Sequence, residues 1–285
     1  MFIDVALLLV VVALWMTQSA VRAVKSEGVG FHPPRRAPPP PWGIAVEPVT
    51  WQSSSGESTF QVKGWWVPSK NGAAVLLTHG SGTDRAQVRE ELLILAGAGF
   101  GTLAFDWPGH GESGGEVRLG GPERAAFEGA VDWLTKEKGV QPGHIGAFGI
   151  SNGAALVTAF AAEDGRVAAV AAAGGFTDAV EQTAYEYGGT WPWARAAALW
   201  VARRHMEGGN FRPIDVATKM RGRRSLFITF QDDPVVPSRM APELAQACGG
   251  EVYRIPGEGH ATYAEGGGRP YAEKLVQFFQ ASLVR

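Results

Sequence analysis

The stretch HIGAFGISNGAALVTAFAA, residues 144–162, joins an apolar strand pattern to an apolar helix pattern through the pentapeptide GISNG. Residues 144–150 favour a buried strand, and residues 152–162 favour a helix. Gly149 and Gly153 allow strand and helix to approach closely at the turn, with Ser151 between them. A strand that turns this sharply into a helix lifts the serine hydroxyl above the sheet edge, so Ser151 is a candidate nucleophile.

A second Gly-x-Ser-x-Gly match, GESGG at residues 111–115, competes with GISNG. The pattern alone is weak evidence in a chain with 38 glycines, so the flanking sequence has to decide. Ser113 follows the loop sequence DWPGHG and has neither a strand directly before it nor a helix directly after it. We predict that Ser113 is a loop residue without a catalytic task.

Strand and helix patterns alternate from about residue 45 to the end of the chain. Further strand patterns lie at residues 59–68, 73–78, 101–105, 167–173, 225–230 and 251–255. Further helix patterns lie at 90–99 and 122–134 and in a closing helix with Tyr271, Leu275, Phe278 and Phe279 on its apolar face. This alternation predicts an α/β domain over residues 45–285, with a mostly parallel central sheet and helices on both faces. Its site should lie at the carboxyl ends of the strands.

Residues 176–213 interrupt this alternation with an aromatic segment. Trp191, Trp193 and Trp200 exceed what one amphipathic helix face needs. We predict a small helical lid insertion over a pocket; a pair of ordinary surface helices is the alternative.

Chain order indicates where the partners of Ser151 should lie, because nucleophile, acid and base follow one another on a fold of this kind. His260 lies in a glycine-rich loop after a predicted strand and is the candidate base, whereas His205 precedes the candidate acid. The acid should follow the strand at 225–230, where Asp232 and Asp233 are adjacent. Neighbours on an extended chain point apart, and the pattern does not choose between the two.

Five motifs occur in an order and spacing that resemble the α/β-hydrolase superfamily, in particular serine hydrolases of the ABHD-type and serine-aminopeptidase-like groups. They are LLTHGSG (76–82), FDWPGHGESGG (105–115), GISNG (149–153), QDDPVVP (231–237) and GEGH (257–260). The resemblance covers the chain from about residue 45 onward and implies the α/β-hydrolase fold.

The same resemblance implies residue roles. Asp233 would be the acid, because in such proteins it commonly stands four residues before the proline of a D-x-x-V-P segment. The backbone N–H groups of Ser81 and Asn152 would form the oxyanion hole, and His110 would be structural. The implied activity is hydrolysis of a carboxylic ester, thioester or amide through Ser151, Asp233 and His260. The apolar N-terminal segment and the Trp-rich segment at 176–213 favour a hydrophobic acyl substrate.

Two other functions stay open. An aminopeptidase-like enzyme would need acidic groups to hold the substrate amine, and Glu181 and Glu186 in the interrupting segment are candidates. A non-catalytic, hydrolase-like binding scaffold is the other, and the intact Ser151, Asp233 and His260 count against it. Near balance of charge, with 26 Lys and Arg against 28 Asp and Glu, does not suggest a nucleic-acid partner. The sequence holds no metal-binding or phosphate-cradling motif, so we expect no cofactor and no metal.

The N-terminal segment differs from the rest of the chain. Residues 5–16, VALLLVVVALWM, are uninterrupted apolar, and we predict a transmembrane anchor helix over residues 1–24. The basic residues Arg22 and Lys25 follow the apolar run, which favours a membrane-bound protein with a cytoplasmic catalytic domain. A signal peptide, cleaved to leave a secreted or periplasmic protein, is the alternative. Residues 25–44 are rich in proline and predict an extended linker.

Overall fold

The computed structural model describes residues 43–188, 196 and 210–284. The predicted anchor, nearly all of the linker and most of the predicted lid lie outside the described residues, so these three stay predictions. Within the described ranges no helix is both long and apolar enough to cross a bilayer.

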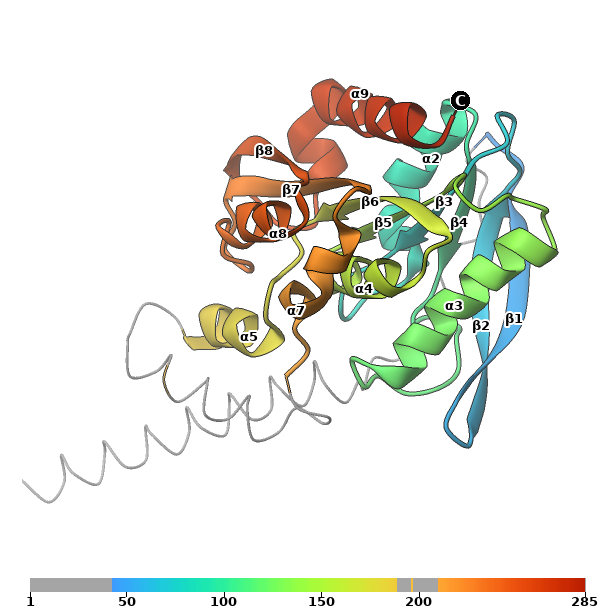
Figure 1. Ribbon diagram of the computed structural model, residues 1–285, viewed down its shortest axis with the longest axis horizontal. Helices are drawn as coiled ribbons and strands as arrows, with labels where there is room; N and C mark the ends of the chain where they lie inside the picture. The colour runs from blue at the N-terminus through green and yellow to red at the C-terminus, as the bar shows by residue number, and fades with distance from the viewer. Residues whose placement is uncertain (1–42, 189–195, 197–209, 285) are drawn as a thin grey trace, which may run out of the picture.

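A mixed sheet of eight strands forms the centre of the described part of the molecule, in the order β1-β2-β4-β3-β5-β6-β7-β8 (Figure 1). Strand β2 runs antiparallel to both its neighbours, and every pairing from β4 to β8 is parallel. The strands are β1 (Glu47–Ser55), β2 (Ser58–Val67), β3 (Ala74–Thr78), β4 (Gly101–Phe105), β5 (Ile145–Ile150), β6 (Val167–Ala173), β7 (Arg224–Asp232) and β8 (Glu251–Glu258). The alternation of strand and helix patterns therefore predicted the fold class correctly.

Helices cover both faces of this sheet. Helices α2 (Arg89–Gly97) and α9 (Tyr263–Leu283) lie together on one face, while α3 (Gly121–Lys136), α4 (Asn152–Glu163) and α8 (Met240–Cys248) cover the other (Figure 1). The remaining helical elements are η1 (Arg85–Val88), α5 (Ala179–Gly188), α7 (Pro213–Ala217) and η2 (Thr218–Met220).

Two apolar layers hold the sheet between the helices. Leu76 and Leu77 are adjacent on β3 and both fully buried, yet they belong to different apolar clusters on opposite faces. Because successive side chains of a strand point to opposite faces, a strand buried on both sides reads as a continuous apolar run. This is why the run at 73–78 was recognisable.

Strand β1 was missed by the sequence patterns. It pairs with β2 alone at the outer end of the sheet, and most of its side chains are exposed. Only Trp51 and Ser53 are buried. An edge strand that buries so few side chains has too few apolar residues to show the alternation of apolar and polar positions that predicts a strand.

Glycine at the turn after β5 sets the distance between helix α4 and the sheet. A Cβ built on Gly153 would overlap the backbone oxygen of His79 and lie 2.8 Å from that of Thr78. A Cβ on Gly149 would in turn overlap the backbone of Gly153. Both glycines of GISNG are therefore needed for the close packing of β3, β5 and α4.

Candidate active site

Ser151 stands alone between strand β5 and helix α4, in a backbone conformation that non-glycine residues seldom adopt. Its φ is 55° and its ψ is −120°. Its N–H donates to the backbone oxygen of Ala173 at the end of β6, at 2.8 Å. Such strain persists only where the surroundings enforce it, and it is frequent at functional sites. Here it presents the hydroxyl at the carboxyl edge of the parallel strands, as the motif predicts.

A continuous pair of hydrogen bonds connects Ser151 to a buried carboxylate. His260, in the loop after β8, has Nε2 2.8 Å from Ser151 Oγ and Nδ1 2.8 Å from Asp233 Oδ2. Because a carboxylate only accepts, Nδ1 carries the proton and Nε2 accepts from the serine hydroxyl. The structure thus brings together the three residues predicted from the motifs.

The tertiary structure distinguishes the two adjacent aspartates after β7. Asp232 is exposed, whereas Asp233 is 4% exposed and faces His260. The other carboxylate oxygen of Asp233 accepts the backbone N–H groups of Val235 and Val236, each at 2.9 Å. These two donors fix the carboxylate in the turn and compensate its burial.

Ser81 and Asn152, the expected oxyanion donors, line the same cavity as Ser151. Asn152 is the first residue of α4, so its N–H has no acceptor within the helix. The N–H of Gly80 donates to the side-chain oxygen of Gln87 at 2.7 Å. The N–H of Gly80 is therefore occupied, and the oxyanion role of the next N–H, that of Ser81, stays a prediction. Gln87 had no signal in the sequence, because nothing in a helical segment indicates that a side chain folds back onto a loop.

His79 fixes the start of the same loop. Its Nε2 accepts the N–H of Trp107 at 3.0 Å, so its Nδ1 carries the proton and donates to the Gly80 oxygen at 2.7 Å. His110 packs beside it, with ring centroids 5.1 Å apart, and is buried. Both imidazoles lie among backbone groups of the loops after β3 and β4, so a structural role for His110 is consistent with its position.

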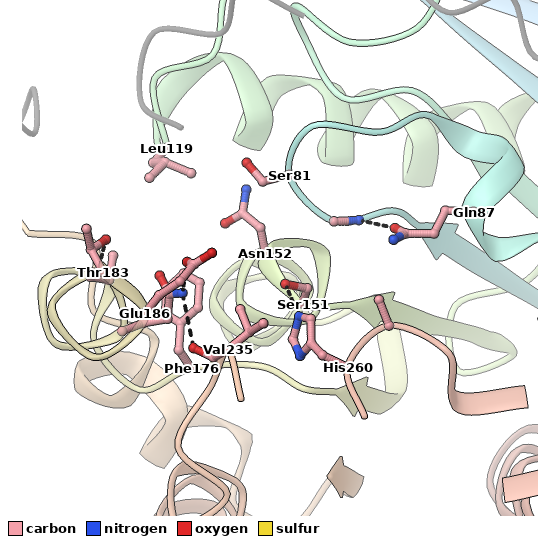
Figure 2. A pocket seen from close by; sticks show the side chains of 14 residues that line it. Ser81, Gln87, Leu119, Ser151, Asn152, Phe176, Thr183, Glu186, Val235 and His260 are labelled. Carbon is pink, nitrogen blue, oxygen red and sulfur yellow. Dashed lines mark hydrogen bonds between the residues drawn. The ribbon is translucent and has the colours of Figure 1, made fainter. Parts of the chain in front are cut away.

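A cavity of about 240 Å³ opens in front of the serine (Figure 2). Its apolar wall includes Phe176, Ala179, Val235 and Leu119. Helix α5 contributes the polar side chains of Gln182, Thr183 and Glu186 to its lining. In Figure 2, Thr183 and Glu186 lie on the side of the opening away from His260. Leu119 lies next to Ser81 in this view, on the side opposite Gln87. Helix α5 belongs to the segment predicted as a lid, and its described part forms one wall of this cavity.

The two acidic residues considered for amine binding have different surroundings. Glu181 forms an ion pair with Arg239 and does not line the cavity. Glu186 lines it, and one of its oxygens accepts from the amide of Gln182 at 2.7 Å. Of the two, only Glu186 is positioned to contact a ligand.

Ser113 has a structural environment instead. Its Oγ donates to the backbone oxygen of Asp106 at 2.8 Å and accepts the N–H of Lys63 at 2.9 Å, so it bridges β2 to the end of β4. The Asp106 carboxylate accepts the N–H groups of Arg85 and Glu112 and pairs with the Arg85 guanidinium. Burial raises the pKa of Asp106 in spite of these partners. The loop is an internal brace, and Ser113 is absent from the lining of the cavity.

No group of three or more His, Cys, Asp or Glu side chains is placed to hold a metal ion within the described ranges. The groups around Ser151 are those of acid–base and nucleophilic chemistry: a hydroxyl, an imidazole, a carboxylate and backbone N–H donors.

The sequence matches the model of the X-Pro dipeptidyl-peptidase (S15) family over residues 33–226 of the 285. The chain belongs to this family. The S15 family is part of the α/β-hydrolase superfamily of serine hydrolases, so the resemblance found in the sequence motifs is confirmed. The matched region contains Ser81, Ser151 and Asn152 and ends before Asp233 and His260.

Two uncharacterized proteins from different strains of Mycobacterium tuberculosis are each 29% identical to the chain over 210 residues. The alignment covers 70% of this chain and 68% of each relative. These relatives have no assigned activity, so they support common ancestry and add no substrate.

Solved structures share the fold at low sequence identity. An esterase from Pyrococcus furiosus superposes with a TM-score of 0.74 at 19% identity, over 88% of this chain and 97% of that one. An alpha-beta hydrolase from Vibrio vulnificus gives 0.65 at 21% identity, over 82% and 81% of the two chains. These comparisons establish an α/β-hydrolase fold.

Proposed function

We propose that this hydrolase cleaves carboxylic ester bonds of a hydrophobic acyl substrate through a covalent acyl-enzyme on Ser151. The observation that carries the proposal is the unbroken connection from Ser151 through His260 to the buried Asp233, opening on a cavity with an apolar wall. Thioesters and activated amides undergo the same chemistry and belong to the same proposal.

In the first half of the reaction, His260 Nε2 takes the proton of the Ser151 hydroxyl as Oγ attacks the acyl carbonyl. Asp233 stays ionised and stabilises the imidazolium that forms. The backbone N–H groups of Ser81 and Asn152 stabilise the oxyanion of the tetrahedral intermediate, each donor contributing roughly 3 to 4 kcal/mol.

His260 then protonates the departing alcohol, which completes the acyl-enzyme. In the second half, His260 removes a proton from the water that attacks the acyl carbonyl, and it returns this proton to Ser151 Oγ as the carboxylic acid leaves. The strained backbone of Ser151 keeps Oγ in place throughout, which lowers the entropic cost of reaching the transition state.

A peptidase that recognises the amino end of its substrate is the second candidate. Membership of the S15 family favours it, and so does the position of Glu186 in the cavity wall, where a carboxylate could hold a substrate ammonium group. The apolar wall formed by Phe176, Val235 and Leu119 supports the esterase, as does the fold shared with the Pyrococcus furiosus esterase.

The nucleophile is tested by labelling the full chain with a fluorophosphonate probe, which forms a covalent bond with an activated serine. The native chain and Ser113→Ala should be labelled, and Ser151→Ala should not. Labelling that persists in Ser151→Ala, or that never occurs in the native chain, would rule out the mechanism.

The substrate class is then tested with two panels: p-nitrophenyl esters from acetate to octanoate, and aminoacyl-prolyl p-nitroanilides with free or acetylated amino ends. We expect turnover of the esters, with kcat/KM unaffected by Glu186→Gln. Preference for anilides with a free amino end, lost on acetylation and in Glu186→Gln, would establish the peptidase instead.

A further inference from the structure

Tyr263 is a buried polar residue close to the candidate catalytic residues that the mechanism above does not use. It is the first residue of α9, three positions after His260, and its side chain is 0% exposed. Its hydroxyl oxygen has no hydrogen-bond partner among the described residues. A buried phenol normally finds a partner, so its position near a polar site requires an explanation.

The hydroxyl lies against Gly174, next to the imidazole of His260. A Cβ built on Gly174 would overlap Tyr263 Oη and lie 3.1 Å from His260 Cε1, so Gly174 leaves the room that these two side chains share. Gly174 follows β6 with a φ of +65°, a conformation that glycine adopts without strain. Any side chain there would displace the tyrosine hydroxyl from the site.

The aromatic ring is held by its neighbours and not by the hydroxyl. It packs on Phe230 of β7 with centroids 5.1 Å apart, and it meets the His260 ring edge-on at 6.5 Å. The strand that supplies Phe230 also leads into Asp233. The ring is therefore fixed relative to both His260 and Asp233, and only the O–H direction is free to rotate.

Charge determines how that hydroxyl acts. Burial, and after it the negative charge of Asp233, raises the pKa of Tyr263 well above its usual value. The phenol therefore stays protonated at any pH at which the enzyme works, and toward a carboxylate it is a donor. The other titratable groups near the pair are His260 itself, Tyr185 of α5, which donates to the backbone oxygen of Asp233 at 3.2 Å, and Tyr271 of α9.

We propose that Tyr263 is a positioning residue: its hydroxyl, buried beside His260 and without a partner in the part of the chain that the structure describes, turns in the working enzyme to donate to the Asp233 carboxylate and so tunes the basicity of the Asp233–His260 pair. The inference rests on the proposed function. Two backbone donors hold one carboxylate oxygen of Asp233, and the oxygen facing His260 has the imidazole N–H as its donor. A phenol donor makes the carboxylate less basic, so His260 releases its proton at a lower pH and is ready to act as a base.

The test is Tyr263→Phe in the full chain, with kcat and KM for a p-nitrophenyl ester measured across pH. Loss of the donor should move the acid limb of the kcat/KM profile upward by roughly 0.5 to 1 pH unit. KM should not change, because Tyr263 does not line the cavity. Tyr271→Phe is the matched control: this tyrosine is also fully buried in α9, but its hydroxyl donates to Glu91, away from Asp233. It should leave the pH profile unchanged.

A second measurement separates the proposal from a purely structural role. If the hydroxyl donates to Asp233, Tyr263→Phe lowers the thermal midpoint. If it is an unpaired buried group, its removal raises the midpoint and leaves the acid limb in place, and the proposal fails. Incorporation of 3-fluorotyrosine in place of Tyr263 keeps ring and hydroxyl but makes a stronger donor, so the acid limb should move downward; no movement would also overturn the proposal.

Fluorophosphonate labelling at alkaline pH keeps this test independent of the proposed function. Labelling of Ser151 in Tyr263→Phe with an unmoved pH profile refutes the role of Tyr263 alone. Absence of labelling in the native chain refutes the proposed function.

Discussion

Replacing Glu91 with glutamine should stabilise the protein at alkaline pH far more than in acid. Glu91 lies on α2 with 2% exposure, and the hydroxyl of Tyr271 on α9 donates to its Oε1 at 2.9 Å. Burial raises the pKa of Glu91 from 4.5 to about 7, and the Tyr271 hydrogen bond only partly offsets this. Above that pH the native protein must keep a carboxylate charge between the two helices that cover one face of the sheet.

The sign follows from the order of the two pKa values. The unfolded chain ionises at about 4.5 and the folded chain at about 7, so the protonated group favours the native state. This stability is fully present below pH 4.5 and is lost as pH rises to about 7. Glutamine does not ionise, so its advantage over glutamate should grow by roughly 2 to 3 kcal/mol between pH 5 and pH 8.

The assay is thermal unfolding of the full chain, followed by near-ultraviolet circular dichroism in one buffer series at pH 5 and pH 8. For a domain of this size the difference corresponds to a relative gain in Tm of roughly 5 to 10 °C at pH 8 over that at pH 5. Glu90→Gln is the matched control on the same helix, since its side chain is 46% exposed and pairs with Arg89. It should change the free energy of unfolding by less than about 0.5 kcal/mol at either pH. An equal gain for Glu91→Gln at both pH values would refute the reasoning, because it would mean that this carboxyl ionises alike in the folded and unfolded chains.

Three further predictions concern the turn, the cavity and the brace. Gly153→Ala should lower the free energy of unfolding by about 2 kcal/mol or more, measured by thermal unfolding, and reduce fluorophosphonate labelling, because the new methyl group meets the backbone after β3. The control Gly97→Ala, with open space around it, should be neutral or slightly stabilising in thermal unfolding. Leu119→Gly should raise the free energy of unfolding by up to about 1 kcal/mol, because it relieves a backbone held at a φ of 53°. It should also increase kcat/KM for longer p-nitrophenyl esters, and an unchanged dependence of kcat/KM on acyl chain length would exclude Leu119 as a wall of the acyl site. Ser113→Ala should lose about 1 to 3 kcal/mol of stability in thermal unfolding yet keep full labelling, whereas loss of labelling in a folded variant would give Ser113 a catalytic role.

Local sequence patterns predicted most of the elements near the site. Residues 101–105 and 167–173 were predicted as strands with the same bounds that the structure has, because strands buried on both faces need apolar residues at every position. The GISNG turn was predictable for a related reason: Gly149 packs on the backbone of Gly153, four residues along the chain, whereas the contact of Gly153 with the backbone of His79 is not local. Edge strand β1 was not, since its one paired side leaves little apolar surface to encode.

The sequence by itself determined the alternation of strand and helix, the turn at Ser151 and the identity of His260, because these depend on period, on glycine and on order along the chain. The residue pattern alone did not separate Asp232 from Asp233, and the choice of Asp233 came from the family resemblance. The tertiary structure supplies the physical reason, since the placement of β7 buries Asp233 against His260 and leaves Asp232 exposed. It also decided that Ser113 braces β2 and that Gln87 holds the N–H of Gly80. Each of these depends on contacts between segments distant in the chain, and the residue pattern of one segment does not indicate which distant segment it will contact.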